Sequence, residues 1–331
     1  MKTYNWGIIG TGWIANKMAE ALHYVPQSKL YAIGSRSLDK AQEFATNYNC
    51  KAYGSYEELL NDTLVDIIYV ATPHSYHCAN TLMAIAKGKH VLCEKPFAVN
   101  GQEVKKMIDA AREKNVFLME ALWTRFNPRL IKVKEIIDSG MLGKVKLLTS
   151  NFGERKPFSP DNRFFCNDLI GGALLDMGIY SLFTALFLLG KPKSITATGT
   201  IGATGVDTNC NVNLVYDDDT FATIYTSLLA ETDSNTTIFC EKGDIHLSQY
   251  VYAPNQITIT PLNGKPEDIV VDVNENLYAY EAIEVINCLE NQKNQSDKWT
   301  WDDSVMIMNI MDEIRREIGL VYPNHDFTIQ N

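Results

Sequence analysis

Residues Trp6 to Ala15 read W-G-I-I-G-T-G-W-I-A, an apolar run that ends in a glycine-rich turn. A glycine pattern of this kind recurs by chance in long chains, so its surroundings decide its meaning. Here the turn precedes Asn16 to Tyr24, a stretch whose apolar residues recur at helical spacing. The sequence therefore predicts a strand, a glycine turn and a helix, in the order that a dinucleotide-binding fold requires.

Strands and helices continue to alternate through the first 121 residues. The further strands are expected at Lys29–Gly34, Val65–Ala71, His90–Cys93 and Val116–Met119, and the further helices at Leu38–Tyr48, Tyr76–Lys87 and Gly101–Lys114. Alternation with helices of about 10 to 15 residues is typical of parallel βαβ units. Residues 1–121 are therefore predicted to form a doubly wound Rossmann domain of the α/β class.

The pattern changes in residues 122–331, which are rich in short strands separated by turn signals. Strands are expected at Val145–Phe152, Ser194–Thr200, Asn209–Tyr216, Thr220–Leu228, Thr236–Glu241, Asp244–Leu247 and Gln256–Thr260, and helices at Pro128–Asp138, Gly171–Leu188, Tyr280–Asn291 and Asp302–Glu317. This order predicts an α+β domain with a large, mostly antiparallel, open-faced sheet. The last helix is expected to close this domain or to pack back on the first.

The composition excludes several classes of protein. The 331 residues exceed what one hydrophobic core usually organises, and 40 acidic against 30 basic residues give a formal charge of -10 that would repel nucleic acid. The seven cysteines are scattered singly, which fits a reducing cytoplasm. No signal peptide is expected, and the longest apolar run, Tyr180 to Leu189, is shorter than the about 18 residues that span a membrane.

The glycine turn is predicted to bind the pyrophosphate of a dinucleotide. Gly10 would permit the tight turn, Gly12 the close approach of the backbone to the phosphates, and Ala15 the packing of helix on strand. The phosphates would then lie at the N-terminus of the helix, where unpaired N–H groups point at them. The other cofactor contacts expected in this turn are Thr11, Trp13 and Ile14.

The end of the second strand favours NADP(H) over NAD(H). An NAD-binding protein is expected to carry Asp or Glu there, whereas this chain has Ser35, Arg36 and Ser37, with Lys40 one helical turn later. A guanidinium and an ammonium suit a 2′-phosphate. The alternative is that Arg36 and Lys40 are solvated surface charges, in which case NAD(H) remains the other candidate.

Residues His90–Pro96 read H-V-L-C-E-K-P, and with the glycine turn and Thr72-Pro73 they resemble the Gfo/Idh/MocA family of oxidoreductases. Segments 119–128, 151–153 and 171–180 are similar to its branch of dimeric dihydrodiol dehydrogenases. This resemblance implies NADP-dependent oxidation of cyclic trans-diols or sugars, and a homodimer formed through the open sheet. It also implies a cis peptide bond before Pro96 and cofactor contacts at Thr72, Pro73, His77, Glu94 and Lys95.

The proton that accompanies hydride transfer is assigned to a tyrosine and a lysine. Tyr180 stands where many family members have His, and a cation beside a tyrosine favours the tyrosinate. We therefore expect Tyr180 to transfer the proton and Lys95 to be its electrostatic partner. The sequence leaves open the alternative in which these two roles are exchanged. Asp176, one turn before Tyr180, would orient the substrate hydroxyl or Lys95. The alternatives are a surface lysine, a core tyrosine and a structural aspartate.

Aromatic and basic residues after predicted strands are candidates for the substrate wall. Trp123, Arg125 and Phe152 are assigned to it, with Phe126, Tyr278 and Tyr280 as weaker candidates, although core packing explains aromatic residues equally well. The pair His74-x-x-His77 lacks the further ligands of a zinc site, so no metal is expected.

The substrate class stays open between two kinds of function. One is a dihydrodiol, sugar, anhydrosugar or inositol-type dehydrogenase or reductase. The other is a regulatory protein that senses NADP without turnover, against which the joint presence of Lys95, Asp176 and Tyr180 argues.

Overall fold

The computed structural model describes residues 2–326, and these divide into two compact units. The first unit comprises the chain up to Trp123 together with Asn274–Met308, and the second comprises Thr124–Val273 and the chain from Asn309 onward. The predicted division at 121/122 assigned residues 274–308 to the second domain, whereas the structure groups them with the first. The reason is that Trp301 Nε1 donates to Leu118 O at 2.9 Å, which ties this late segment to an early strand.

The first unit contains a six-stranded sheet with the strand order β3-β2-β1-β4-β5-β6, and all of its pairs are parallel. This confirms the predicted doubly wound Rossmann fold. Its strands are β1 Tyr4–Ile9, β2 Ser28–Gly34, β3 Lys51–Tyr53, β4 Ile67–Val70, β5 His90–Glu94 and β6 Leu118–Ala121. The order reverses between β1 and β4, the point at which such sheets bind nucleotides at their carboxyl ends.

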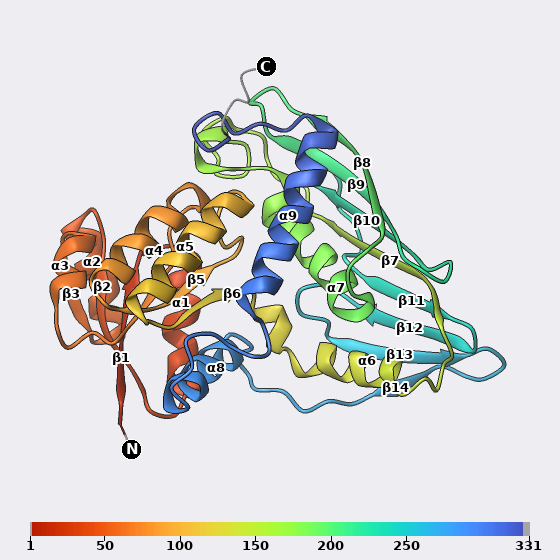
Figure 1. Ribbon diagram of the computed structural model, residues 1–331, viewed down its shortest axis with the longest axis horizontal. Coiled ribbons are helices and arrows are strands. Elements are labelled where there is room, and N and C mark those ends of the chain that lie inside the picture. The colour runs from red at the N-terminus through yellow and green to blue at the C-terminus, as the bar shows by residue number, and fades with distance from the viewer. Residues whose placement is uncertain (1, 327–331) are drawn as a thin grey trace. The chain divides into compact units, whose positions relative to one another are not determined.

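Except for α3, which was not predicted, the helices of this unit begin and end close to the predicted positions. They are α1 Trp13–Ala21, α2 Leu38–Tyr48, α3 Tyr56–Asn61, α4 His77–Ala86, α5 Gly101–Lys114 and α8 Ala279–Glu290. Helices α4 and α5 lie side by side against the sheet (Figure 1). Ser37, Ser55 and Asn100 cap α2, α3 and α5 by accepting backbone N–H groups, which explains why these three helices start there.

The second unit contains an eight-stranded sheet with the order β14-β13-β12-β11-β7-β10-β9-β8. Only the pair β7 and β10 is parallel among the described pairs, so the prediction of a mostly antiparallel sheet is confirmed. The strands are β7 Val145–Gly153, β8 Ser194–Ile201, β9 Asp207–Val215, β10 Phe221–Ser227, β11 Thr236–Cys240, β12 Gly243–Ser248, β13 Gln256–Pro261 and β14 Glu267–Ile269.

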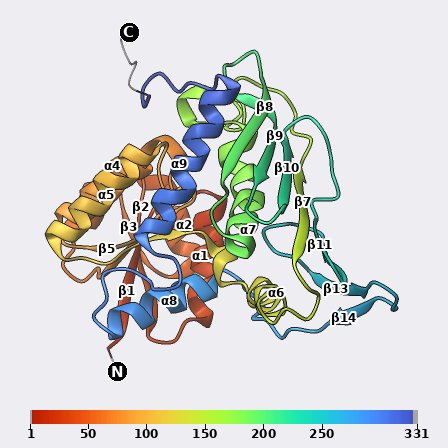
Figure 2. The ribbon, with the colours of Figure 1, turned by 45° about the vertical axis from the view of Figure 1, so that its right-hand side comes forward.

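Helix α7, Ile179–Leu189, covers one face of this sheet (Figure 2). On that face Ser150 Oγ of β7 donates to Ser181 Oγ of α7 at 3.0 Å, and both side chains are buried. Alternate residues of β7, β9 and β10 point the other way and are partly exposed, so the second face is open. The other helices with residues in this unit are α6 Pro128–Asp138 and the later part of α9 Trp301–Ile318.

The predicted helix Gly171–Leu188 has an irregular first half. A 3-10 turn, η4 Asn167–Leu169, is followed by a π-helical turn, η5 Leu174–Gly178, and only then by α7. Together Asn167–Leu189 make a 23-residue segment long and apolar enough to cross a membrane, so the expectation that no run would reach that length was wrong. Because 89% of its apolar window is buried inside the protein, it also meets the description of a core helix.

Candidate functional site

The glycine turn after β1 is shaped by a close backbone contact. Gly10 has φ +105°, and a Cβ built on it would lie 2.5 Å from the carbonyl oxygen of Ala71, which follows β4. Any other residue would therefore be strained in conformation and would collide with the neighbouring strand end. Gly10 brings the ends of β1 and β4 together at the point where the strand order reverses.

Helix α1 begins at this turn with its first N–H groups uncapped by a side chain. Its N-cap is Gly12, and a Cβ built on Gly12 would meet no atom within 4 Å. Protein packing therefore does not require glycine at this position, whereas an approaching phosphate would. The first turn of α1 carries no acidic residue, and Ala15 is fully buried. These features fit the pyrophosphate of a dinucleotide.

Arg36 follows β2 and is held among aromatic rings. Its guanidinium lies over the ring of Tyr76 at 5.6 Å from the centroid. Burial raises the pKa of Tyr56, and the nearby Arg36 charge acts in the opposite direction. Ser35 is buried, and Lys40 is exposed on the first turn of α2. A cation held in this position can bind an anionic substituent of a ribose.

His77 is the first residue of α4 and is fully buried. Its Nδ1 lies 2.8 Å from the carbonyl oxygen of Pro96 and its Nε2 lies 2.8 Å from that of Thr72. Burial lowers the pKa of its imidazole. His77 thus joins the end of β4 to the end of β5 through two backbone oxygens.

The bond between Lys95 and Pro96 is cis, as predicted. Glu94, the last residue of β5, is buried and accepts hydrogen bonds from the Tyr69 hydroxyl and, at 3.2 Å, from Lys95 N. Glu281 of α8 is fully buried, and burial followed by the Glu94 charge raises its pKa well above the usual range. Lys95 therefore directly follows Glu94, a buried carboxylate that interacts with the buried carboxyl group of Glu281.

In the second unit, Tyr180 lies in a cluster of three aromatic rings. Its ring centroid is 5.2 Å from that of Tyr252 and 6.2 Å from that of Phe152, and the latter two rings are 5.2 Å apart. Tyr180 is in the first turn of α7 and is 7% exposed. The cluster combines two phenols, those of Tyr180 and Tyr252, with the apolar ring of Phe152.

Asp176 lies in the π-helical turn just before α7. Both of its carboxylate oxygens face the guanidinium of Arg163, with Nη2 to Oδ2 at 3.2 Å and Nη1 to Oδ1 at 3.4 Å. Arg163 belongs to the long loop after β7. Such π-turns are frequent at functional sites, and here the turn carries a buried carboxylate.

Two family models match this chain. One, described as an oxidoreductase family with an NAD-binding Rossmann fold, covers residues 4–122, and the other, described as the GFO/IDH/MocA C-terminal domain, covers residues 130–246. The chain belongs to the Gfo/Idh/MocA family. This member is therefore a dehydrogenase or reductase with an NAD(P)-binding Rossmann domain.

Known proteins align with almost the whole of this chain. The trans-1,2-dihydrobenzene-1,2-diol dehydrogenase of Xenopus laevis is 37% identical, with 96% of this chain and 99% of that protein aligned. The Homo sapiens enzyme of the same name is 34% identical, with 96% and 98% aligned. Among solved structures, a 3-ketoreductase from Actinomadura kijaniata in complex with NADP and TDP-benzene has a TM-score of 0.89 at 24% identity, covering 96% and 98% of the two chains.

A second solved structure of the same fold is the aldose-aldose oxidoreductase from Caulobacter crescentus complexed with glycerol. It has a TM-score of 0.87 at 23% identity and covers 96% of this chain and 97% of that one. At these identities both structures support the fold of this Gfo/Idh/MocA protein.

The remaining predicted site residues of this family member are dispersed. Trp123 ends the first part of the first unit, and its ring centroid lies 4.5 Å from that of Tyr278, with the two rings tilted by 35°. Arg125 lies in the second unit, with its guanidinium over the ring of Phe187 at 4.6 Å. Of the predicted substrate residues, the structure brings Phe152 and Tyr180 into one cluster. Among residues 2–326 no group of three or more His, Cys, Asp or Glu side chains is arranged to hold a metal ion.

Three residues of the candidate site were missed by sequence reasoning. Tyr252 completes the aromatic cluster, Arg163 pairs with Asp176, and Tyr76 lies under Arg36. Tyr76 had a usable signal, because it follows Thr72-Pro73 at the end of a predicted strand. Tyr252 and Arg163 lie in loops, and no periodic pattern marks them.

Proposed function

We propose that this protein transfers a hydride between NADP(H) and the hydroxyl or carbonyl carbon of a cyclic diol or sugar. The observation that carries the proposal is the Tyr180 phenol, which lies within the ring cluster of Phe152 and Tyr252. Flat rings on either side suit an apolar cyclic substrate, and the hydroxyl supplies a proton carrier. Relatives named trans-1,2-dihydrobenzene-1,2-diol dehydrogenase support the same substrate class.

In this proposal the chain's own residues handle charge and protons. The bound nicotinamide supplies or accepts the hydride. Tyr180 gives a proton to the substrate oxygen in reduction and takes it in oxidation, and the Lys95 ammonium stabilises the negative charge that develops there. Asp176, fixed by Arg163, orients a substrate hydroxyl by accepting its hydrogen bond.

The test of the proposed function is nicotinamide absorbance followed over time with purified protein. NADP would be offered with cyclic trans-diols, aldoses and inositols, and NADPH with the matching carbonyl compounds. Turnover on diols supports the proposal. Tight NADPH binding with no turnover across the panel would instead favour an NADP sensor.

Sugars form the second candidate substrate class. Asp176 and Arg163 place a carboxylate and a guanidinium close to the turn that carries Tyr180, and such groups hydrogen-bond polyols. Faster turnover of aldoses or inositols than of diols in the same panel would select this class.

Arg36→Ala should weaken NADPH binding by about 10- to 100-fold and NADH binding by less than about twofold. The reason is that the guanidinium is proposed to pair with the 2′-phosphate, and charge-assisted hydrogen bonds of this kind contribute about 1.5–3 kcal/mol. Quenching of protein fluorescence by each cofactor measures both dissociation constants. Arg112→Ala, which removes an exposed arginine of α5, serves as the control. Equal losses for both cofactors would contradict the 2′-phosphate assignment.

We also propose a homodimer formed through the open face of the eight-stranded sheet. The face carries Thr223 and Tyr225 from β10, and half-buried Asn211 and exposed Asn213 from β9. Sedimentation velocity should give twice the mass of the chain. Thr223→Arg should yield monomers by placing a charge in the middle of this face, whereas Thr63→Arg, on an exposed loop of the first unit, should not. A monomeric wild type would contradict the proposal.

We place this activity in the cytoplasm. All seven cysteines are free thiols, which supports a reducing compartment. The proposed partners are the small-molecule substrate, the cofactor and a second copy of the chain, with no nucleic acid or membrane.

A further inference from the structure

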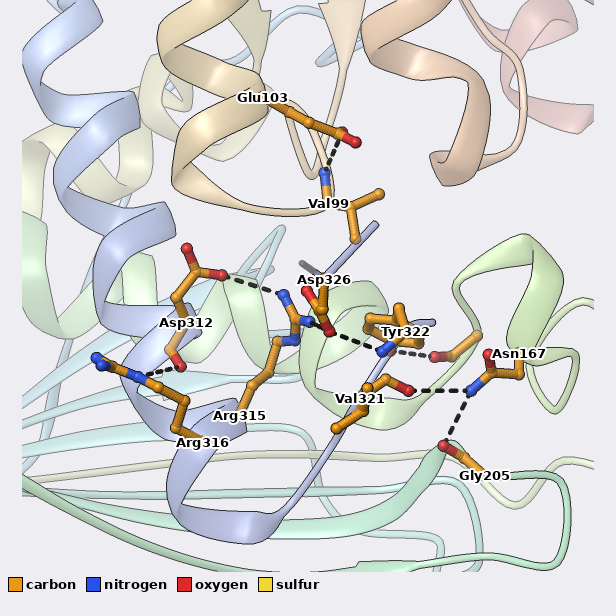
Figure 3. Close-up of polar contacts among 11 residues, drawn as sticks. Val99, Glu103, Asn167, Gly205, Asp312, Arg315, Arg316, Val321, Tyr322 and Asp326 are labelled. Carbon is orange, nitrogen blue, oxygen red and sulfur yellow. Dashed lines mark hydrogen bonds and ion pairs between the residues drawn. The ribbon is translucent and has the colours of Figure 1, made fainter. Parts of the chain in front are cut away.

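The residues that follow α9 also pack against the rest of the second unit. After Ile318 the helix stops at Gly319, with φ +72°, and residues 320–326 run on as a segment that we call the C-terminal strap (Figure 3). Leu320 and Tyr322 of the strap are buried. The strap belongs to the second unit, which also holds the turn before α7.

Arg315 and Asp326 fix the shape of the strap. The buried Arg315 guanidinium donates to Asp312 Oδ1 at 3.1 Å and to Asp326, and it also lies over the ring of Tyr322 at 4.8 Å. Asp326 Oδ2 in turn accepts from Tyr322 N at 2.7 Å. These contacts come from one end of α9 and hold the Tyr322 ring in a defined position (Figure 3).

The strap is attached to the segment that leads into the π-helical turn. The Tyr322 hydroxyl donates to the carbonyl oxygen of Gly171 at 2.6 Å. One residue earlier in the strap, Val321 O accepts from Asn167 Nδ2 at 3.4 Å, and the same Nδ2 donates to Gly205 O at 3.0 Å. The hydroxyl of Tyr322 is thus its polar link to the turn, in a fully buried position.

The segment that accepts this hydrogen bond leaves no room for a side chain at Gly172. Gly172 has φ +123°, and a Cβ built on it would lie 2.1 Å from Asp207 Oδ1 and 3.3 Å from the Tyr322 hydroxyl oxygen. Asp207 Oδ2 accepts from Leu174 N at 2.7 Å, at the first residue of the π-helical turn. Tyr322 and Asp207 therefore hold the two ends of the segment from Gly171 to Leu174, which leads into that turn.

We infer that Tyr322 is a positioning residue for the reaction. Through Gly171 it sets the placement of the π-helical turn, which carries Asp176, and of the first turn of α7, which carries Tyr180. The inference rests on the proposed function of those two residues. Asp176 lies two residues after Leu174, and Tyr180 lies in the next turn, so a shift of the approach moves both. Displacements of about 1 Å in such groups can cost about 100-fold in rate.

The test compares Tyr322→Phe with Tyr216→Phe in the full-length protein. Both changes remove one buried hydroxyl from the second unit, and that of Tyr216 has no hydrogen-bond partner among residues 2–326. We measure kcat, KM, the NADPH dissociation constant and amide hydrogen exchange over residues 171–180. We expect Tyr322→Phe to lower kcat about tenfold, to leave NADPH binding within about twofold, and to speed exchange in that segment. Tyr216→Phe should match the wild type.

Two results overturn the inference. Unchanged kcat with faster exchange makes Tyr322 merely structural, and lower kcat with unchanged exchange removes the route through Gly171. A wild type without turnover on any substrate is a failure of the proposed function, and exchange alone then decides whether the strap holds the turn. If Tyr322→Phe does not fold, Asn167→Ala, which frees Val321 from the same segment, should produce the same changes with smaller size.

Discussion

Tyr180→Phe should lower kcat by about 100- to 10,000-fold while NADPH affinity stays within about twofold, because it removes one proton carrier and leaves the ring in place. The phenylalanine ring fills the same space between Phe152 and Tyr252, so the cluster keeps its packing. Stopped-flow absorbance of NADPH with a carbonyl substrate measures the chemical step. An additional effect on KM is not expected, since the hydroxyl acts mainly in the transition state.

The control for this experiment is Tyr216→Phe, which removes a buried hydroxyl without a hydrogen-bond partner among the described residues. It should leave kcat within about twofold of the wild type. An active Tyr180→Phe enzyme would remove Tyr180 from the mechanism and leave Lys95 as the proton donor. In that case Lys95→Arg, which keeps the charge but holds its proton more tightly, should lose most of the activity.

The fold was predictable because its central strands carry strong local signals. The strands of a parallel sheet are buried on both faces and read as apolar runs, as Ile67–Val70 does. The edge strands β3 and β14 and the six-residue helix α3 were missed. Lys51–Tyr53 and Glu267–Ile269 have three residues each, contain no buried residue, and form strands only because a neighbouring strand pairs with them.

The candidate site was predictable where the chemistry depends on neighbours in sequence. The tight turn at Gly10 was anticipated from its local motif, and the cis bond at Lys95-Pro96 from the family resemblance of the segment that contains it. Contacts between distant residues were not, because no spacing rule relates them. The hydroxyl of Tyr322 donates to Gly171 across 151 positions of sequence, and Trp301 reaches Leu118 across 183. The same long-range ties moved residues 274–308 into the first unit.

Asp207→Asn should make the protein more stable at pH 8. It should also make the free energy of unfolding depend less on pH below that value. Asp207 is fully buried, and burial raises the pKa of its carboxyl from 3.8 to about 7, although Leu174 N–H, Ala173 N–H and the Arg315 charge act to lower it. Between about pH 4 and pH 7 the folded protein therefore keeps a proton that the unfolded chain has lost. The free energy of unfolding falls by about 1.4 kcal/mol per pH unit in that window.

Because the pKa of Asp207 is higher in the folded protein than in the unfolded chain, its contribution to stability decreases as the pH rises. Below about pH 4 both states are protonated and the favourable contribution is complete, and above about pH 7 it is lost, a difference of about 4 kcal/mol. Asparagine carries no charge at any pH and still offers an oxygen to Leu174 N, so the variant lacks this loss. Urea unfolding at pH 5 and pH 8 measures it, with Asp161→Asn, an exposed carboxyl of the same unit, as the control. If the wild type and Asp207→Asn change in parallel between the two pH values, then Asp207 is ionised in the folded protein at pH 5, and the turn before α7 is held by a charged carboxylate.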